Sequence, residues 1–389
     1  MTGESSRGLR WLITAFAAIL LVWPSKAAAK GKNEPPPQPP AVTFRGRHWK
    51  PMLIGVLAAL ALLGWALIAP SPVIGVGWLI GFLFWLGIAV GALVLIAIHA
   101  VTGGRWGATC WPVLAPAAAS IPIFLLFGLP VAFILPTLFP WASDPSQAGQ
   151  GVAALYLNPE GWWLRAGIAL IAWSLIALVL LRRRNRPHRL LAAIGLVVHA
   201  VIITLVGLDW ILSLDPHFYS TDFGATLAIL QILAALAWTA ALRVVPSGGR
   251  GRVGDIGGLI IATSLGSLYL GYSQYLVIWY GDLPDRIKWY MDRQDGVWFW
   301  VDAFAILLAN LVPFFILIRQ RWRDDSDTVG LAGGCVLAGL FVHFVWLLAP
   351  AFGALAVLSA LLALVAIGAL WVTLAYGLLA PRLEDAHAG

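Results

Sequence analysis

Four titratable side chains lie inside or at the edge of long apolar stretches of this chain, where such groups can carry protons. His199 and Asp209 stand ten residues apart in one stretch, Asp302 is near the start of a second, and His343 is central in a third. A carboxylate at membrane depth costs about 2.5–3.5 kcal/mol on insertion scales, so its presence needs a specific reason. Because imidazole titrates near neutrality and burial shifts carboxyl groups upward, this set is suited to proton transfer.

Neutral hydrogen-bonding side chains accompany these four groups, and they are Gln231, Tyr272, Gln274 and Asn310. Intramembrane polar groups usually face the interior of a helix bundle and mark a relay or a substrate path, which is the function that we expect for the whole set. A structural alternative stays open, since one intramembrane histidine often only joins two helices by a hydrogen bond. Asp209 is also close enough to the end of its stretch to be hydrated.

The sequence offers little for metal chemistry. Cys110 and Cys335 stand alone, without partners at metal-ligand spacing, so we expect two buried small side chains and no disulfide. A bis-histidine haem needs two imidazoles at matched depth, and His199 with His343 is the only mid-membrane pair. We therefore expect no directly bound metal or haem.

The residues with potential chemistry must be positioned by membrane-spanning helices. Of 389 residues, 60% are hydrophobic and only 11% are charged, with a mean hydropathy of +0.86, whereas a soluble domain carries about 25% charged residues. The apolar residues form continuous blocks of about twenty, the length of a membrane-crossing helix, and lack the alternation of barrel strands. The sequence predicts an all-α polytopic transmembrane helix bundle of about ten spans within residues 51–380. The expected spans are roughly 51–70, 76–99, 113–139, 163–181, 190–214, 223–245, 257–280, 297–318, 330–350 and 354–378.

The third expected span is unusual because it contains the prolines Pro116, Pro122, Pro130 and Pro136. Each proline removes a backbone hydrogen bond, and in a membrane a neighbouring group must then satisfy the freed carbonyl. We expect this span to be kinked or broken.

The Lys and Arg residues fall almost entirely on one side when the spans alternate. With the N-terminus in the cytoplasm, 21 of the 25 lie on the cytoplasmic side, and the exceptions are Arg165, Arg286, Lys288 and Arg293. This distribution follows the positive-inside rule and predicts that both ends of the bundle are cytoplasmic. The net charge of +7 therefore reflects topology and does not indicate nucleic-acid binding.

The segments outside the bundle differ in character. Residues 1–50 form a basic, Pro-containing extension that we expect to be cytoplasmic, with residues 30–40 extended or disordered. The short hydrophobic segment 11–23 is compatible with a signal peptide, with a membrane anchor or with a nonessential extension. Residues 381–389 form a short tail that is expected on the cytoplasmic side.

The loop after the seventh expected span mixes charges and aromatic rings, including Asp282, Asp285, Trp289 and Tyr290. Any single Trp at this level is most simply an interfacial anchor. A mixed-charge aromatic loop of this density is also typical of a docking surface, so these four residues are candidates for contact with a partner.

Two motifs carry a family resemblance. LDWILSLDPHFYSTDFG (208–224) followed by an apolar span, and YSQYLVIWYGDLPD (272–285) followed by a Trp-rich span entry, resemble the integral membrane subunits of alternative complex III. GLFVHFVWLLAP (339–350) is similar to the penultimate helix of that family, which often has an acidic residue near the position of His343. The resemblance covers about residues 45–380 and is closest to the F-type subunit, of the polysulfide-reductase-type (NrfD-like) class.

The resemblance implies a function. It implies a non-autonomous subunit of a quinol:cytochrome c oxidoreductase in the bacterial cytoplasmic (inner) membrane, supporting quinol oxidation and proton translocation. The implied partners are a sister polytopic subunit and periplasmic iron–sulfur and multihaem cytochrome subunits, together with membrane lipids. Haem and iron–sulfur clusters are expected in those partners and not in this chain. The eight polar residues named first become candidates for a proton path or a quinone pocket.

Two other functions stay open from the sequence. A secondary transporter or ion-coupled permease is compatible with ten spans, a proline-broken helix and polar groups at the midplane. A purely structural membrane anchor for redox subunits is also compatible. Asp209→Asn and Asp302→Asn discriminate the anchor from the respiratory function, because an anchor should keep turnover and proton pumping unchanged.

Overall fold

The computed structural model describes residues 49–68, 72–104, 106–148, 152–182, 189–215, 218, 220–243, 252–281, 284–294 and 296–380. The predictions for the basic extension, apart from its last two residues, and for the tail after 380 lie outside these residues. They stay predictions.

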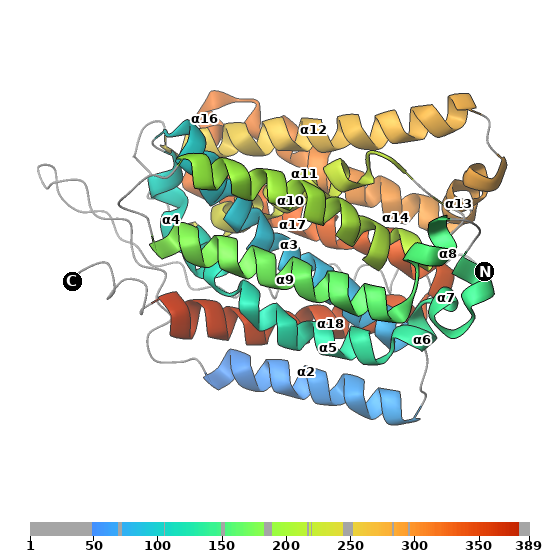
Figure 1. The fold of residues 1–389 in the computed structure, drawn as a ribbon. Helices are drawn as coiled ribbons and strands as arrows, with labels where there is room; N and C mark the ends of the chain where they lie inside the picture. The colour runs from blue at the N-terminus through green and yellow to red at the C-terminus, as the bar shows by residue number, and fades with distance from the viewer. Residues whose placement is uncertain are drawn as a thin grey trace, which may run out of the picture. The chain divides into compact units, whose positions relative to one another are not determined.

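Ten helical segments of the described chain are long and apolar enough to cross a membrane, and together they confirm the all-α polytopic bundle (Figure 1). The uninterrupted ones are α2 (Trp49–Ile68), α3 (Pro72–Thr102), α9 (Pro159–Arg182), α10 (Arg189–Trp210), α11 (Phe223–Ala241), α12 (Arg252–Gly281) and α17 (Ser326–Leu348). The eighth span joins α14 (Val297–Ile306), a π-turn (Leu307–Leu311) and α15 (Val312–Leu317), and the tenth joins α18 (Leu355–Val372) to a second π-turn (Thr373–Leu379). The side that faces the cytoplasm stays a prediction from the charge distribution.

The third span is broken, as its prolines predict. α4 (Trp106–Ala119) ends before a 3-10 turn (Ile121–Ile123), and α5 (Phe124–Phe133) and α6 (Leu135–Leu138) follow. Ser120 stands at the first break, where its hydroxyl donates to the carbonyl of Ala117 over 2.6 Å and accepts from the indole of Trp371 over 2.7 Å. A polar side chain thus supplies hydrogen bonds where the helix is interrupted, as membrane depth requires.

Helix α3 forms the centre of the bundle, and glycines allow its neighbours to approach closely. A Cβ on Gly81 would lie 2.9 Å from the backbone of Ala363 on α18, and one on Gly91 would overlap the carbonyl oxygen of Gln231 on α11. Lipid supplies no hydrophobic drive between helices, so such small residues stabilise the bundle by permitting tight packing.

Gly91→Ala is expected to destabilise the bundle by about 1–3 kcal/mol, because the added methyl group must push α3 and α11 apart. The measurement is the free energy of unfolding of the purified chain in a denaturing-detergent titration. The control is Gly64→Ala on α2, where a Cβ would meet no heavy atom within 4 Å. Equal stability of the two variants would contradict the close contact.

Asp209, Asp302 and His343 lie towards the same end of the bundle. Successive spans run antiparallel, so the C-terminal ends of α10, α12 and α17 share this end with the N-terminal ends of α9, α11 and α14. Two short helices, α8 (Val152–Tyr156) and α13 (Pro284–Gln294), lie at the same end (Figure 1). We call it the α8/α13 end.

Candidate functional site

Asp302 and His343, two residues predicted from separate spans, face each other across the α14–α17 contact. Their Oδ1 and Nδ1 atoms lie 4.0 Å apart. This distance is too long for a direct hydrogen bond and suits one bridging water or a small side-chain movement. The two side chains are 29% and 24% exposed respectively, so both are partly buried but reachable from outside the chain. A carboxyl and an imidazole in this arrangement can exchange a proton.

A π-turn and a glycine place this pair. The turn Leu307–Leu311 follows α14, and Ser264 of α12 donates a 3.3 Å hydrogen bond to the carbonyl of Ala309 within it. Gly339 of α17 packs directly on this segment, because a Cβ there would overlap the backbone nitrogen of Ala309. His343 comes one helical turn after Gly339 and therefore reaches the level of Asp302. π-Turns of this kind occur frequently at functional sites.

Asn310, in the same π-turn, has a structural partner. Its Oδ1 accepts a 2.7 Å hydrogen bond from the hydroxyl of Ser267 on α12, and both side chains are buried. The bond ties α12 to the eighth span. Asn310 thus supports the segment that positions Asp302, and its described hydrogen bond leads to α12 and not to the pair.

Aromatic rings cover the pair on the side of α13. The ring of His343 stacks on Trp346 with centroids 5.6 Å apart, and Trp346 meets Trp289 of α13 edge to face at 5.7 Å. Trp289 also stacks on Phe218 at 4.3 Å and is only 6% exposed. Trp289 therefore packs inside the chain, and the structure does not support its predicted use as a surface for a partner.

Arg293 fastens α13 to the end of α17. Its guanidinium donates to the carbonyl of Leu347 over 3.2 Å and to that of Trp289 over 3.0 Å, and lies 3.7 Å from the Trp289 ring centroid. A cation is favourable at a helix C-terminus, where carbonyl groups are unpaired. Burial lowers the pKa of Arg293 to about 10, so the group still carries its charge at neutral pH.

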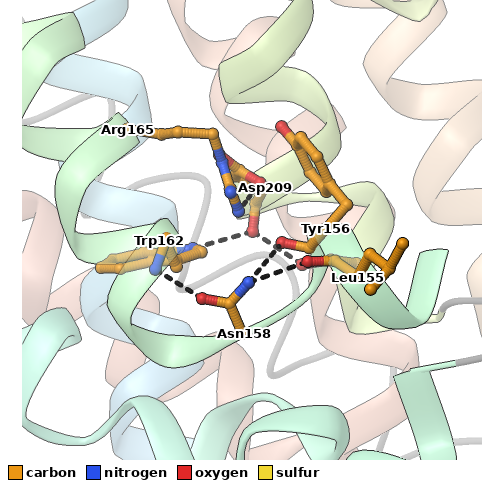
Figure 2. Close-up of polar contacts among 8 residues, drawn as sticks. Leu155, Tyr156, Asn158, Trp162, Arg165 and Asp209 are labelled. Carbon is orange, nitrogen blue, oxygen red and sulfur yellow. Dashed lines mark hydrogen bonds and ion pairs between the residues drawn. The ribbon is translucent and has the colours of Figure 1, made fainter. Parts of the chain in front are cut away.

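Asp209 has a different environment, which Figure 2 shows. Nε and Nη2 of Arg165 on α9 donate to its two carboxylate oxygens over 2.7 and 2.9 Å. The Asp209 side chain is 2% exposed and that of Arg165 is 19% exposed. A bidentate pair of this kind fixes two helices strongly, because neither charge can be left alone at this depth.

The turn before α9 completes this buried ion pair. Asn158 caps α9 by accepting a 2.6 Å hydrogen bond from the Gly161 nitrogen, and the indole of Trp162 donates to the carbonyl of Asp209 over 3.0 Å (Figure 2). The Tyr156 ring lies 3.8 Å from the guanidinium carbon of Arg165. Burial and then the charge of Asp209 raise the pKa of the Tyr156 phenol. The cluster therefore stabilises a positioned carboxylate.

His199 makes the helix-to-helix contact that the structural alternative described. The indole of Trp173 on α9 donates to Nδ1 of His199 over 3.2 Å, and the histidine is 5% exposed. This bond assigns the ring proton to Nε2 and leaves the imidazole neutral. His199 and Asp209 both bond to α9, whereas Asp302 meets α17, so these contacts divide the predicted set into separate clusters.

The remaining predicted residues are dispersed. Gln231 is buried against α3 and its Oε1 has no hydrogen-bond partner in the described structure, while Gln274 is buried on α12 and Tyr272 is 63% exposed on that helix. Asp282 and the side chain of Asp285 lie outside the described residues, so their proposed contact with a partner stays a prediction.

Two residues that matter here were not among the predicted site residues. Arg165 entered only the prediction of topology from the charge distribution. A charged side chain within an apolar span usually pairs with an opposite charge, and this rule pointed to Asp209 as its partner. Arg293 stands in the loop after the second motif. Its position depends on how α13 folds back against the end of α17, which no spacing along the chain indicates.

No protein-family model matches the chain, and no curated protein sequence matches it either.

Proposed function

We propose that this chain is a membrane subunit of a quinol-oxidising respiratory complex, and that it moves protons through the Asp302–His343 pair. The resemblance of its two motifs to the alternative complex III subunits supports the respiratory assignment. In this proposal the iron–sulfur and haem centres belong to partner subunits on the periplasmic side of the bacterial cytoplasmic membrane. The chain itself supplies the titratable groups and the surface to which those partners bind.

The observation that carries the proton-moving part is the approach of Asp302 to His343, 4.0 Å apart and only partly buried. Both residues stand within apolar spans, where an ionisable group is costly without a function or a close partner. At 4.0 Å a small side-chain movement brings the two groups into hydrogen-bond contact, and both side chains are partly exposed at the surface of the chain. Neither feature is needed for helix packing alone.

The contrast with Asp209 supports this choice. Asp209 is held by two short hydrogen bonds from a guanidinium and is nearly inaccessible. An ion pair of that geometry resists changes of charge, because removing one charge leaves the other uncompensated. We therefore assign Asp209 to architecture and Asp302 to proton movement.

The proposed function is tested by deleting this subunit from its host and by purifying the tagged chain in mild detergent. We expect co-purification with multihaem cytochrome and iron–sulfur subunits, and loss of quinol:cytochrome c activity on deletion. A complementation strain that expresses the intact chain is the control. Intact quinol oxidation in the deletion strain would overturn the proposal. Substrate uptake by the purified chain alone would favour a transporter instead.

A further inference from the structure

Two arginines and a tryptophan are exposed where the eighth membrane span ends, on the opposite side of the bundle from the α8/α13 end (Figure 1). They are Arg319, Arg321 and Trp322, at the bend between α15 and the short helix α16 (Gln320–Arg323). The chain turns at Arg319, whose backbone is extended with φ −81° and ψ 119°. The bend therefore places two guanidinium groups where the apolar span gives way to charged residues.

The residues on each side of the bend indicate that it lies at the membrane surface. Phe315 and Ile318 are exposed at the end of the span, where lipid chains surround an apolar side chain. Trp322 is exposed just beyond them, and tryptophan is enriched at the level of lipid headgroups. Since Arg319 and Arg321 lie between the apolar residues and this indole along the chain, we expect their guanidinium groups at the depth of lipid phosphate groups.

Contacts with α12 and within the bend hold the exposed residues in place. A Cβ on Gly257 of α12 would lie 2.6 Å from Cγ of Arg323, so α16 packs closely on the first turns of α12. The guanidinium carbon of Arg319 lies 4.9 Å from the centroid of the Trp322 ring. The cations at the bend thus belong to a positioned surface.

The two arginines at the bend form no ion pair within the described residues. Three aspartates follow them along the chain, but these carboxylates make other contacts. Asp324 lies against the first turn of α12, and the side chain of Asp325 caps α17. Asp327 pairs with Arg243 over 3.0 Å. The bend therefore presents two positive charges without a described counter-charge.

We propose that Arg319 and Arg321 bind the phosphate group of an anionic phospholipid whose acyl chains lie against Phe315 and Ile318. The Cα atoms of residues two apart are separated by at most about 7.6 Å, so two long arginine side chains can reach one phosphate. A guanidinium group matches phosphate geometry through paired hydrogen bonds, and cations beside a membrane span attract anionic headgroups. This lipid site goes beyond the proposed function, because it requires no redox partner.

The experiment measures lipid binding to the purified full chain in mild detergent by native mass spectrometry. The probes are phosphatidylglycerol and phosphatidylcholine with identical oleoyl chains, which share the phosphate group and differ in net charge. Arg319→Gln/Arg321→Gln is expected to raise the Kd for phosphatidylglycerol about tenfold or more and to leave the weaker binding of phosphatidylcholine unchanged. The matched control is Arg243→Gln, which removes an exposed cation at the same end that already pairs with Asp327 and should keep the Kd of the wild type. Unchanged free energies of unfolding show that the variants are folded.

Several results would overturn the lipid site. A double variant that binds phosphatidylglycerol as tightly as the wild type would show that the two arginines are only solvated charges. Equal weakening by Arg243→Gln would assign the effect to the overall charge of this end. Equal affinity of the wild type for the two lipids would exclude recognition of an anionic headgroup, and displacement of phosphatidylglycerol by an equal concentration of inorganic phosphate would identify free phosphate as the ligand.

Discussion

Asp302→Asn is expected to reduce proton movement by about 10²-fold, the scale on which a positioned acid–base group acts. Asparagine has nearly the same shape as aspartate, so α14 should keep its packing on α17, but the amide cannot give up or take up a proton at this step. His343 would remain, 4.0 Å from the new side chain, without its titratable partner. The measurement is proton release per electron by the complex in sealed liposomes, alongside its quinol oxidation rate.

The control for this substitution is Asp327→Asn. Asp327 has a 76% exposed side chain near the opposite end of the bundle and pairs with Arg243 over 3.0 Å. The Asp327→Asn substitution changes the formal charge of the chain by the same amount and leaves the Asp302–His343 pair intact. Wild-type proton movement in Asp302→Asn would show that the chain acts as a structural anchor for redox subunits, and the proton-moving part of the proposal would be abandoned.

Arg165→Met is expected to destabilise the folded chain by about 3–5 kcal/mol, because it leaves the carboxylate of Asp209 buried without its counter-charge. The Asp209 side chain is 2% exposed, so water cannot replace the two hydrogen bonds that the guanidinium supplies. The same substitution removes the cation from the face of the Tyr156 ring. The free energy of unfolding in a denaturing-detergent titration measures the effect.

The double variant Arg165→Met/Asp209→Leu is the matched control. Replacing both members of a buried ion pair with apolar side chains removes the uncompensated charge, so much of the lost stability should return. Full recovery would show that the pair contributes specificity more than stability. A single Arg165→Met variant as stable as the wild type would contradict a buried ion pair, and Asp209 would again become a candidate for proton transfer.

The all-α bundle and the break in the third span were predictable from the sequence alone. Continuous apolar blocks of membrane-crossing length can only form helices, because every backbone group must find a partner within its own segment. The span is interrupted at Pro122, whereas Pro116 and Pro130 lie inside α4 and α5. These features depend on residues that are neighbours along the chain, which is why composition and spacing were sufficient to predict them.

The division of the polar residues into clusters was decided by the tertiary structure. From the sequence, His199, Asp209, Asp302 and His343 look equivalent, since each is an ionisable group in an apolar stretch. Their differences come from partners far along the chain, at Trp173 for His199 and Arg165 for Asp209. The pairing of helices depends on small residues at close crossings, such as Gly91 and Gly339. Hydropathy does not indicate which helices pair.

Hydropathy and charge thus determined which segments are helices and how many cross the membrane. The loop helix α13 shows what they could not determine. Its aromatic and charged residues suggested a surface, yet Trp289 and Arg293 fold inward against Phe218 and the end of α17. The physical reason is that unpaired carbonyl groups at the C-terminus of a helix attract a cation, and aromatic rings beside the cation bury it. Only the assembled bundle brings the C-terminus of α17 close enough for Arg293 to bind it.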